Sequence, residues 1–139
     1  MNDITSYMLE QTKKILSIDS PTGFTAHAAE YVLGAYKKLG YDAKLTNKGG
    51  IFVCVNDGPD QADDPADAPI LLEAHMDTLG GMVCSINEKG RLMLSALGGM
   101  NPNNAEAENC RVYTRSGKVY SGTFQLKNAS IHVNGSYND

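Results

Sequence analysis

The residues with the clearest capacity for chemistry are His75 and Asp77, which close an apolar run just before two glycines. Residues 70–81 read ILLEAHMDTLGG. Side chains two positions apart on a strand point to the same face, so this imidazole and this carboxylate can lean together. A carboxylate on one ring nitrogen fixes the tautomer of a histidine and makes the other nitrogen a better metal ligand. The pair is therefore a candidate ligand with its orienting partner, which is only part of a site.

Two amphipathic helices are predicted ahead of this pair. Apolar residues recur at helical spacing from Ile4 to Leu16, with a stop near Ile18, and Thr25 can cap a second helix that ends at Gly40. Three β-type runs follow, and the third is apolar enough to form a buried strand. The predicted strands cover residues 42–46, 51–55 and 70–76.

The sequence pattern changes after Gly81. Helical periodicity ends there, and short β-type runs separated by tight turns follow. The turn segments 87–90 and 115–118 each separate two β-type runs, which predicts two hairpins. A polar, turn-rich stretch at 98–109 lies between them, and residues 129–133 form the last predicted strand. The chain therefore divides into an α/β part and an all-β part.

The composition is that of one ordinary globular domain, with 42% hydrophobic and 20% charged residues among 139. The net charge is -4 and no long basic run occurs, so nucleic acid and anionic membranes are not expected partners. No window has the ~18 apolar residues of a membrane span, and the first residues lack the order of a signal peptide. We expect a cytoplasmic protein.

The other groups that could carry chemistry favour ordinary surface or packing roles. The aspartate-rich segment 57–67 lacks the order of an EF-hand loop and is predicted to be a solvated loop. Glu106 and Glu108 lie in a polar segment without an apolar setting, which argues against an acid and base pair. His27 is predicted at the surface of the second helix or near its cap, and His132 is predicted to be structural.

Several separate segments agree with one protein family. They are residues 20–24 (SPTGF), 49–51 (GGI), 74–82 (AHMDTLGGM), 121–123 (SGT) and 129–133 (ASIHV). Together they resemble the N-terminal portion of the M42 family of metallo-aminopeptidases, the glutamyl and deblocking aminopeptidase group. His-x-Asp alone is weak evidence for this family, because related dinuclear peptidases share it. The same motif followed by Leu-Gly-Gly-Met and a β-rich segment is fairly specific to the family.

The resemblance implies an α/β fold class, in which a partial layered, zinc-peptidase-like sheet is followed by a small all-β, barrel-like insertion domain. Residues 1–80 would form the N-terminal part of the α/β catalytic domain. Residues 81–139 would form an incomplete β-rich insertion, which in the family covers the active site and helps dodecamers assemble. A homo-oligomer is therefore the implied assembly.

The activity implied by the resemblance is removal of N-terminal residues from peptide substrates at a site with two divalent metal ions. Zinc, cobalt and manganese are the candidate metals, and the sequence does not choose among them. By this resemblance His75 is a metal ligand. Asp77 is then the catalytic-site aspartate that supports His75 without being a principal ligand.

Most of the ligands that the resemblance requires have no counterpart in this chain. The family draws its bridging aspartate, adjacent glutamates and second histidine from sequence beyond the insertion. After Asp77 the only carboxylates are Glu88, Glu106, Glu108 and Asp139, and no Glu-Glu pair occurs. We therefore expect an N-terminal fragment of a longer enzyme, inactive by itself.

Two alternatives remain open on the sequence alone. The first is an exo-carboxypeptidase or amidohydrolase relative of the M20 type, whose members usually continue from His-x-Asp-Thr with Val-Pro. Here Leu79-Gly80-Gly81 follows instead, which argues against that type. The second is a non-catalytic lid or assembly module that keeps His75 only by descent.

Overall fold

The computed structural model describes residues 3–55, 70–133 and 135. The predicted aspartate-rich loop at 57–67 lies outside them. The chain forms two compact units, Met1–Thr78 and Leu79–Asp139. The assignment of residues 1–80 to a catalytic domain and of 81–139 to an insertion remains a prediction.

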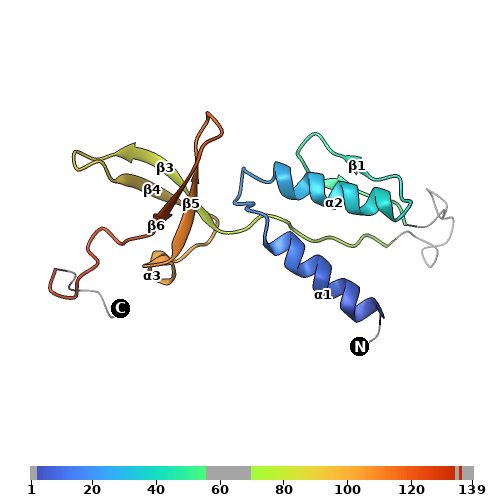
Figure 1. The fold of residues 1–139 in the computed structure, drawn as a ribbon, viewed down its shortest axis with the longest axis horizontal. Coiled ribbons are helices and arrows are strands. Elements are labelled where there is room, and N and C mark those ends of the chain that lie inside the picture. The colour runs from blue at the N-terminus through green and yellow to red at the C-terminus, as the bar shows by residue number, and fades with distance from the viewer. Residues whose placement is uncertain (1–2, 56–69, 134, 136–139) are drawn as a thin grey trace. The chain divides into compact units, whose positions relative to one another are not determined.

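Both predicted helices of the first unit are present (Figure 1). Helix α1 covers Asp3–Leu16 and helix α2 covers Ala26–Lys38. Gly40 has a φ of +91°, a left-handed conformation that glycine adopts readily and that ends a helix, as predicted. Thr25 stands at the N-cap position, but its side chain makes no capping hydrogen bond. None of the helices in the described ranges is long and apolar enough to cross a membrane.

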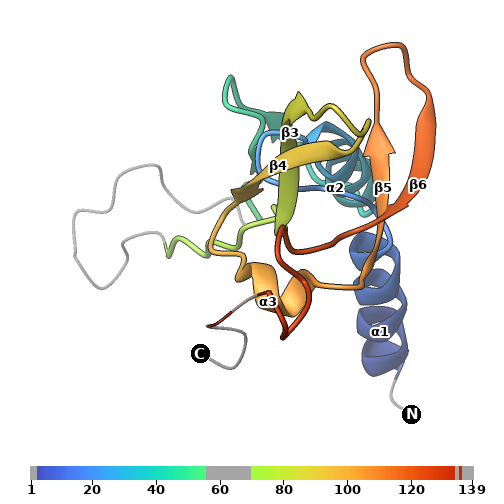
Figure 2. The ribbon, with the colours of Figure 1, turned by 90° about the vertical axis from the view of Figure 1, so that its left-hand side faces the viewer.

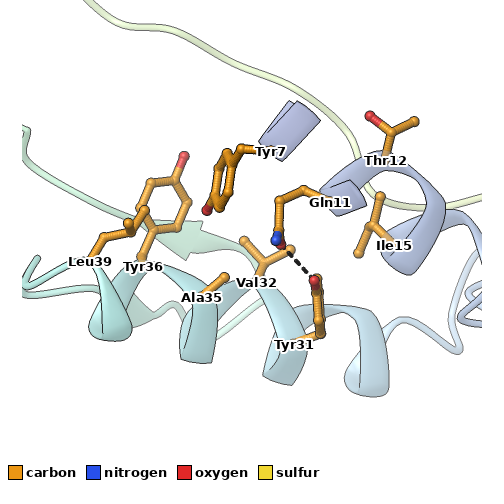
Figure 3. Close-up of a pocket in the computed structure, with 9 residues that line it drawn as sticks. All are labelled: Tyr7, Gln11, Thr12, Ile15, Tyr31, Val32, Ala35, Tyr36 and Leu39. Atoms are coloured by element: carbon orange, nitrogen blue, oxygen red, sulfur yellow. Dashed lines mark hydrogen bonds between the residues drawn. The ribbon is translucent and has the colours of Figure 1, made fainter. Parts of the chain in front are cut away.

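Helices α1 and α2 enclose a groove of about 350 Å³ (Figure 3). The hydroxyl of Tyr31 on α2 donates a hydrogen bond of 2.6 Å to Oε1 of Gln11 on α1. Apolar and tyrosine side chains make up most of the remaining lining, so the two helices meet through a shallow apolar contact. The lining residues are Tyr7, Gln11, Thr12, Ile15, Tyr31, Val32, Ala35, Tyr36 and Leu39.

The first two predicted strands form a small antiparallel hairpin that is shorter than expected. Strand β1 covers Lys44–Leu45 and strand β2 covers Ile51–Phe52. The turn between them is closed by a 2.8 Å hydrogen bond from the amide of Thr46 to the carbonyl of Gly50. Helix α2 lies along this hairpin (Figure 1), which gives the unit one helix-on-hairpin layer.

The prediction of a buried strand over residues 70–76 is wrong for the described structure. These residues form no regular strand, and Ile70 keeps 89% of its surface exposed. A strand needs a neighbour that accepts and donates its backbone hydrogen bonds. Among the described residues the only pairing near this run is a parallel bridge between Pro21 and Thr78, beyond its end. The apolar run is therefore extended but unpaired.

The second unit contains the two predicted hairpins (Figure 2). Their turns are tight, since Gly90 and Gly117 have φ angles of +75° and +79°. A short helix, α3, lies between the hairpins, in the stretch expected to be polar and turn-rich. The elements are β3 (Gly80–Ile86), β4 (Leu92–Leu97), α3 (Pro102–Ala105), β5 (Asn109–Tyr113) and β6 (Val119–Thr123).

The described strands form no closed barrel. They make three separate two-stranded sheets, β1 with β2, β3 with β4, and β5 with β6. The strand predicted at 129–133 is wrong, because these residues form turns and have no strand partner in the part of the chain described. The fold is therefore a mixture of helices and small antiparallel sheets, compatible with part of an α/β protein.

Very few described side chains are fully buried. The buried apolar residues are Ala28, Ala29 and Ala43, and Ser20 is the one buried polar residue among those described. Large apolar side chains such as Leu16 on α1 and Ile86 on β3 stay exposed. Because hydrophobic stabilisation scales with the apolar area removed from water, each unit has little of it and offers apolar surface for further contacts.

Candidate functional site

The segment that carries His75 and Asp77 is held to the turn after α1. The amide of Thr78 donates a 2.8 Å hydrogen bond to the carbonyl of Ser20, and the amide of Thr22 donates one of 3.3 Å to the carbonyl of Thr78. This is the ladder of a parallel bridge at Pro21 and Thr78. Proline has no amide hydrogen, but the bridge uses groups of its two neighbours instead. Residues 20–22 and 76–78 are therefore fixed side by side.

The predicted proximity of His75 and Asp77 is confirmed. Nδ1 of His75 lies 3.2 Å from Oδ1 of Asp77 and 3.0 Å from the backbone carbonyl oxygen of the same residue. Both neighbours are acceptors, so in the neutral ring Nδ1 carries the proton and Nε2 keeps its lone pair. The His75 side chain is 86% exposed, which leaves that lone pair accessible to a ligand.

The second carboxylate oxygen of Asp77 is held by Thr22. The hydroxyl of Thr22 donates a 2.7 Å hydrogen bond to Oδ2 of Asp77. This bond is the main reason that the pKa of Asp77 lies below its usual value; partial desolvation opposes it, and the nearby His75 nitrogen adds to it. Asp77 is therefore an acceptor for two side chains at once.

The other candidate residues from the sequence lie in other elements of the chain. His27 lies on the exposed surface of α2, where its ring meets that of Phe24 edge to face at 5.8 Å. His132 lies in a turn, with its amide bonded to the hydroxyl of Ser130, and Glu106 and Glu108 follow α3. No group of three or more histidine, cysteine or acidic side chains suited to a metal occurs within residues 3–55, 70–133 and 135.

Ser20 and Thr22 were not predicted as site residues, although their segment was part of the family resemblance. Ser20 is 2% exposed and its hydroxyl donates a 2.8 Å hydrogen bond to the carbonyl of Met76. The bonds from Ser20 and Thr22 span 56 and 55 positions of sequence. No local periodicity carries such information, so only the fold brings these residues to the histidine and aspartate segment.

Comparison with known proteins identifies the family of this chain. A model of the M42 glutamyl aminopeptidase family matches residues 50–138. The chain belongs to the M42 glutamyl aminopeptidase family. It is 36% identical over 125 residues to the Bacillus subtilis (strain 168) protein named "Putative aminopeptidase YhfE", covering 90% of this chain and 34% of that relative. It is 32% identical over 112 residues to "Glutamyl aminopeptidase" of Lactococcus lactis subsp. cremoris (strain MG1363), covering 80% and 30%.

This M42 chain spans about a third of the length of the curated relatives it matches. The family match confirms the resemblance seen in the sequence and decides against the M20-type alternative. The roles of His75 and Asp77 as metal ligand and supporting aspartate stay predictions.

Proposed function

We propose that this M42 chain contributes a metal ligand, His75, and its orienting carboxylate, Asp77, to an aminopeptidase that removes N-terminal residues from peptides. The observation that carries the proposal is the pair of acceptor oxygens at 3.0 and 3.2 Å from Nδ1 of His75. They leave Nε2 free, as in histidines that bind metals. The family match supports the peptide substrate.

The donor set suits a divalent ion, with zinc, cobalt and manganese as candidates. An imidazole nitrogen is a common ligand for such metals, and its exposure leaves room for further ligands. Two bound divalent ions would polarise the scissile carbonyl of the peptide. In this chain Asp77 holds the ring of His75 in one orientation, and His75 offers Nε2.

A single imidazole does not complete a catalytic metal site, which ordinarily has three protein ligands. The described residues supply no such cluster. We therefore propose that the 139-residue chain alone holds metal weakly and shows no aminopeptidase turnover. Remaining ligands would come from sequence corresponding to the other two thirds of its relatives.

We also propose that the unit Leu79–Asp139 is the lid and assembly domain of a homo-oligomeric enzyme, barrel-like when complete. Its support is the arrangement of β3 to β6, in which each strand pairs with only one neighbour among the described strands. Open strand edges of this kind accept further strands from the same chain or from another copy.

The ligand role can be tested with Mn²⁺, which broadens the NMR signals of nearby nuclei even when it binds weakly. In the ¹⁵N-labelled chain we expect broadening centred on residues 74–78, and we expect His75→Gln to remove it. His132→Gln is the matched control and should leave it intact. Broadening that is confined to the aspartate-rich segment 57–67, or that survives in His75→Gln, would contradict the ligand role.

The proposed absence of aminopeptidase turnover is tested with aminoacyl-nitroanilides in the presence of zinc, cobalt or manganese. We expect no turnover from the purified chain. Turnover that persists through purification and disappears in His75→Ala would overturn the proposed inactivity of the isolated chain. In the coding DNA downstream of Asp139, an in-frame Glu-Glu pair and a later histidine codon would support the longer enzyme.

A further inference from the structure

The turn that carries Thr22 has a fixed backbone. The amide of Phe24 donates a 2.7 Å hydrogen bond to the carbonyl of Pro21, which closes a four-residue turn. Its third residue, Gly23, has a φ of +85°, the conformation that type II turns require at that position. Thr22 therefore occupies the second position of the turn, and its backbone has little freedom.

The turn is attached to the Asp77 segment by bonds that do not involve the Thr22 side chain. They are the two backbone bonds of the Pro21–Thr78 bridge and the bond from the buried Ser20 hydroxyl to the Met76 carbonyl. The position of the backbone therefore places the Thr22 hydroxyl next to Asp77. Replacing that hydroxyl leaves all three of these bonds available.

The two oxygens of the Asp77 carboxylate face different partners. Oδ2 accepts the 2.7 Å bond from the Thr22 hydroxyl, and Oδ1 lies 3.2 Å from Nδ1 of His75. The Asp77 side chain is 40% exposed, so without a second partner it would be free to turn toward water. A hydroxyl bound to a carboxylate makes a strong, charge-assisted hydrogen bond.

We propose that Thr22 is a positioning residue of the His75–Asp77 pair: its hydroxyl holds Oδ2 of Asp77, which turns Oδ1 toward Nδ1 of His75 and keeps Nε2 free. The value of this arrangement for metal binding rests on the proposed function. The arrangement itself is a property of the metal-free chain and can be measured there.

The test compares Thr22→Val, which keeps the shape and removes the donor, with Thr22→Ser, which keeps the donor. Three-bond couplings to Cγ of Asp77 report its side-chain rotamer. The ¹⁵N shifts of the His75 ring report which tautomer the neutral ring adopts. Thr123→Val makes the same change at an exposed position of β6 and is the matched control.

In the wild-type chain we expect one dominant Asp77 rotamer and an Nδ1-protonated His75. In Thr22→Val the couplings should become averaged, and the ratio of Nδ1–H to Nε2–H tautomers should fall by roughly threefold to tenfold, the effect of losing one hydrogen bond. Thr22→Ser and Thr123→Val should keep the wild-type values. Amide spectra unchanged outside residues 20–24 and 74–79 show that the fold is intact.

The proposal is overturned if Thr22→Val keeps the single Asp77 rotamer and the His75 tautomer. It is also overturned if Thr22→Ser loses them to the same extent as Thr22→Val, because the hydroxyl then has no special role. These outcomes do not depend on metal. If the couplings respond as expected but Mn²⁺ does not broaden residues 74–78, the positioning role stands and the proposed metal role fails.

Discussion

The hydroxyl of Thr22 lies 2.7 Å from Oδ2 of Asp77, although 55 positions of sequence separate the two residues. This contact connects the turn after α1 to the segment that ends in His75-Met76-Asp77. Under the proposed positioning role of Thr22, the orientation of His75 depends on a residue from a different part of the chain. The candidate site is therefore built from two segments.

The acid titration of Asp77 in the metal-free chain should show this contact. Its pKa lies below the usual value, chiefly because of Thr22. The stabilisation from this shift is fully present above the unfolded pKa of about 3.9 and is lost as the pH falls through the lower folded pKa. We expect Thr22→Val to raise the Asp77 pKa, measured from the side-chain carboxyl ¹³C shift. An unchanged titration in this variant would show that Thr22 does not cause the shift.

The hydrogen bond between Tyr31 of α2 and Gln11 of α1 should contribute measurably to the stability of the first unit. Tyr31→Phe removes the hydroxyl that bonds Gln11 and should lower the free energy of unfolding by about 0.5–1.5 kcal/mol. Urea unfolding followed by the helical circular dichroism signal measures this change. Tyr120→Phe on the exposed surface of β6 is the control, with an expected change below about 0.5 kcal/mol. Equal effects of the two variants would contradict the interpretation.

Substitution by alanine should change the stability of the chain in opposite directions at two glycines. Gly23 has a φ of +85°, so Gly23→Ala should destabilise the turn by about 1 kcal/mol, even though a Cβ would meet nothing within 4 Å. Gly34 lies inside α2, also has open space, and has no such φ, so Gly34→Ala should stabilise the chain by about 0.5–1 kcal/mol. Thermal unfolding of both variants checks the signs. Stabilisation by Gly23→Ala would contradict the turn geometry.

The open strand edges of the second unit should promote self-association. Light scattering at increasing concentration should show species larger than a monomer. Val83→Lys together with Val119→Lys places charges on β3 and β6 and should reduce this association, because lysine on an edge strand opposes pairing. Val55→Lys, an exposed valine in the first unit, is the control. A monomer at every concentration would count against edge pairing.

Local patterns in the sequence predicted the local structure well. The helical spacing of α1 and α2, the stop at Gly40 and the turns of the two later hairpins depend on neighbouring residues, and all are present. The strand predictions failed where pairing depends on residues that are distant in the sequence. Residues 70–76 and 129–133 have strand composition, yet apolar and β-branched residues cannot form a strand without a neighbour to pair with.

For the candidate site, the sequence by itself determined the histidine and aspartate pair, because a spacing of two brings their side chains together whenever the backbone is extended. It also determined the M42 family, through motifs matched across most of the chain. Only the tertiary structure decided that Ser20 and Thr22 hold that pair. Their bonds to Met76 and Asp77 depend on how the chain returns after more than 50 residues, which no local propensity encodes.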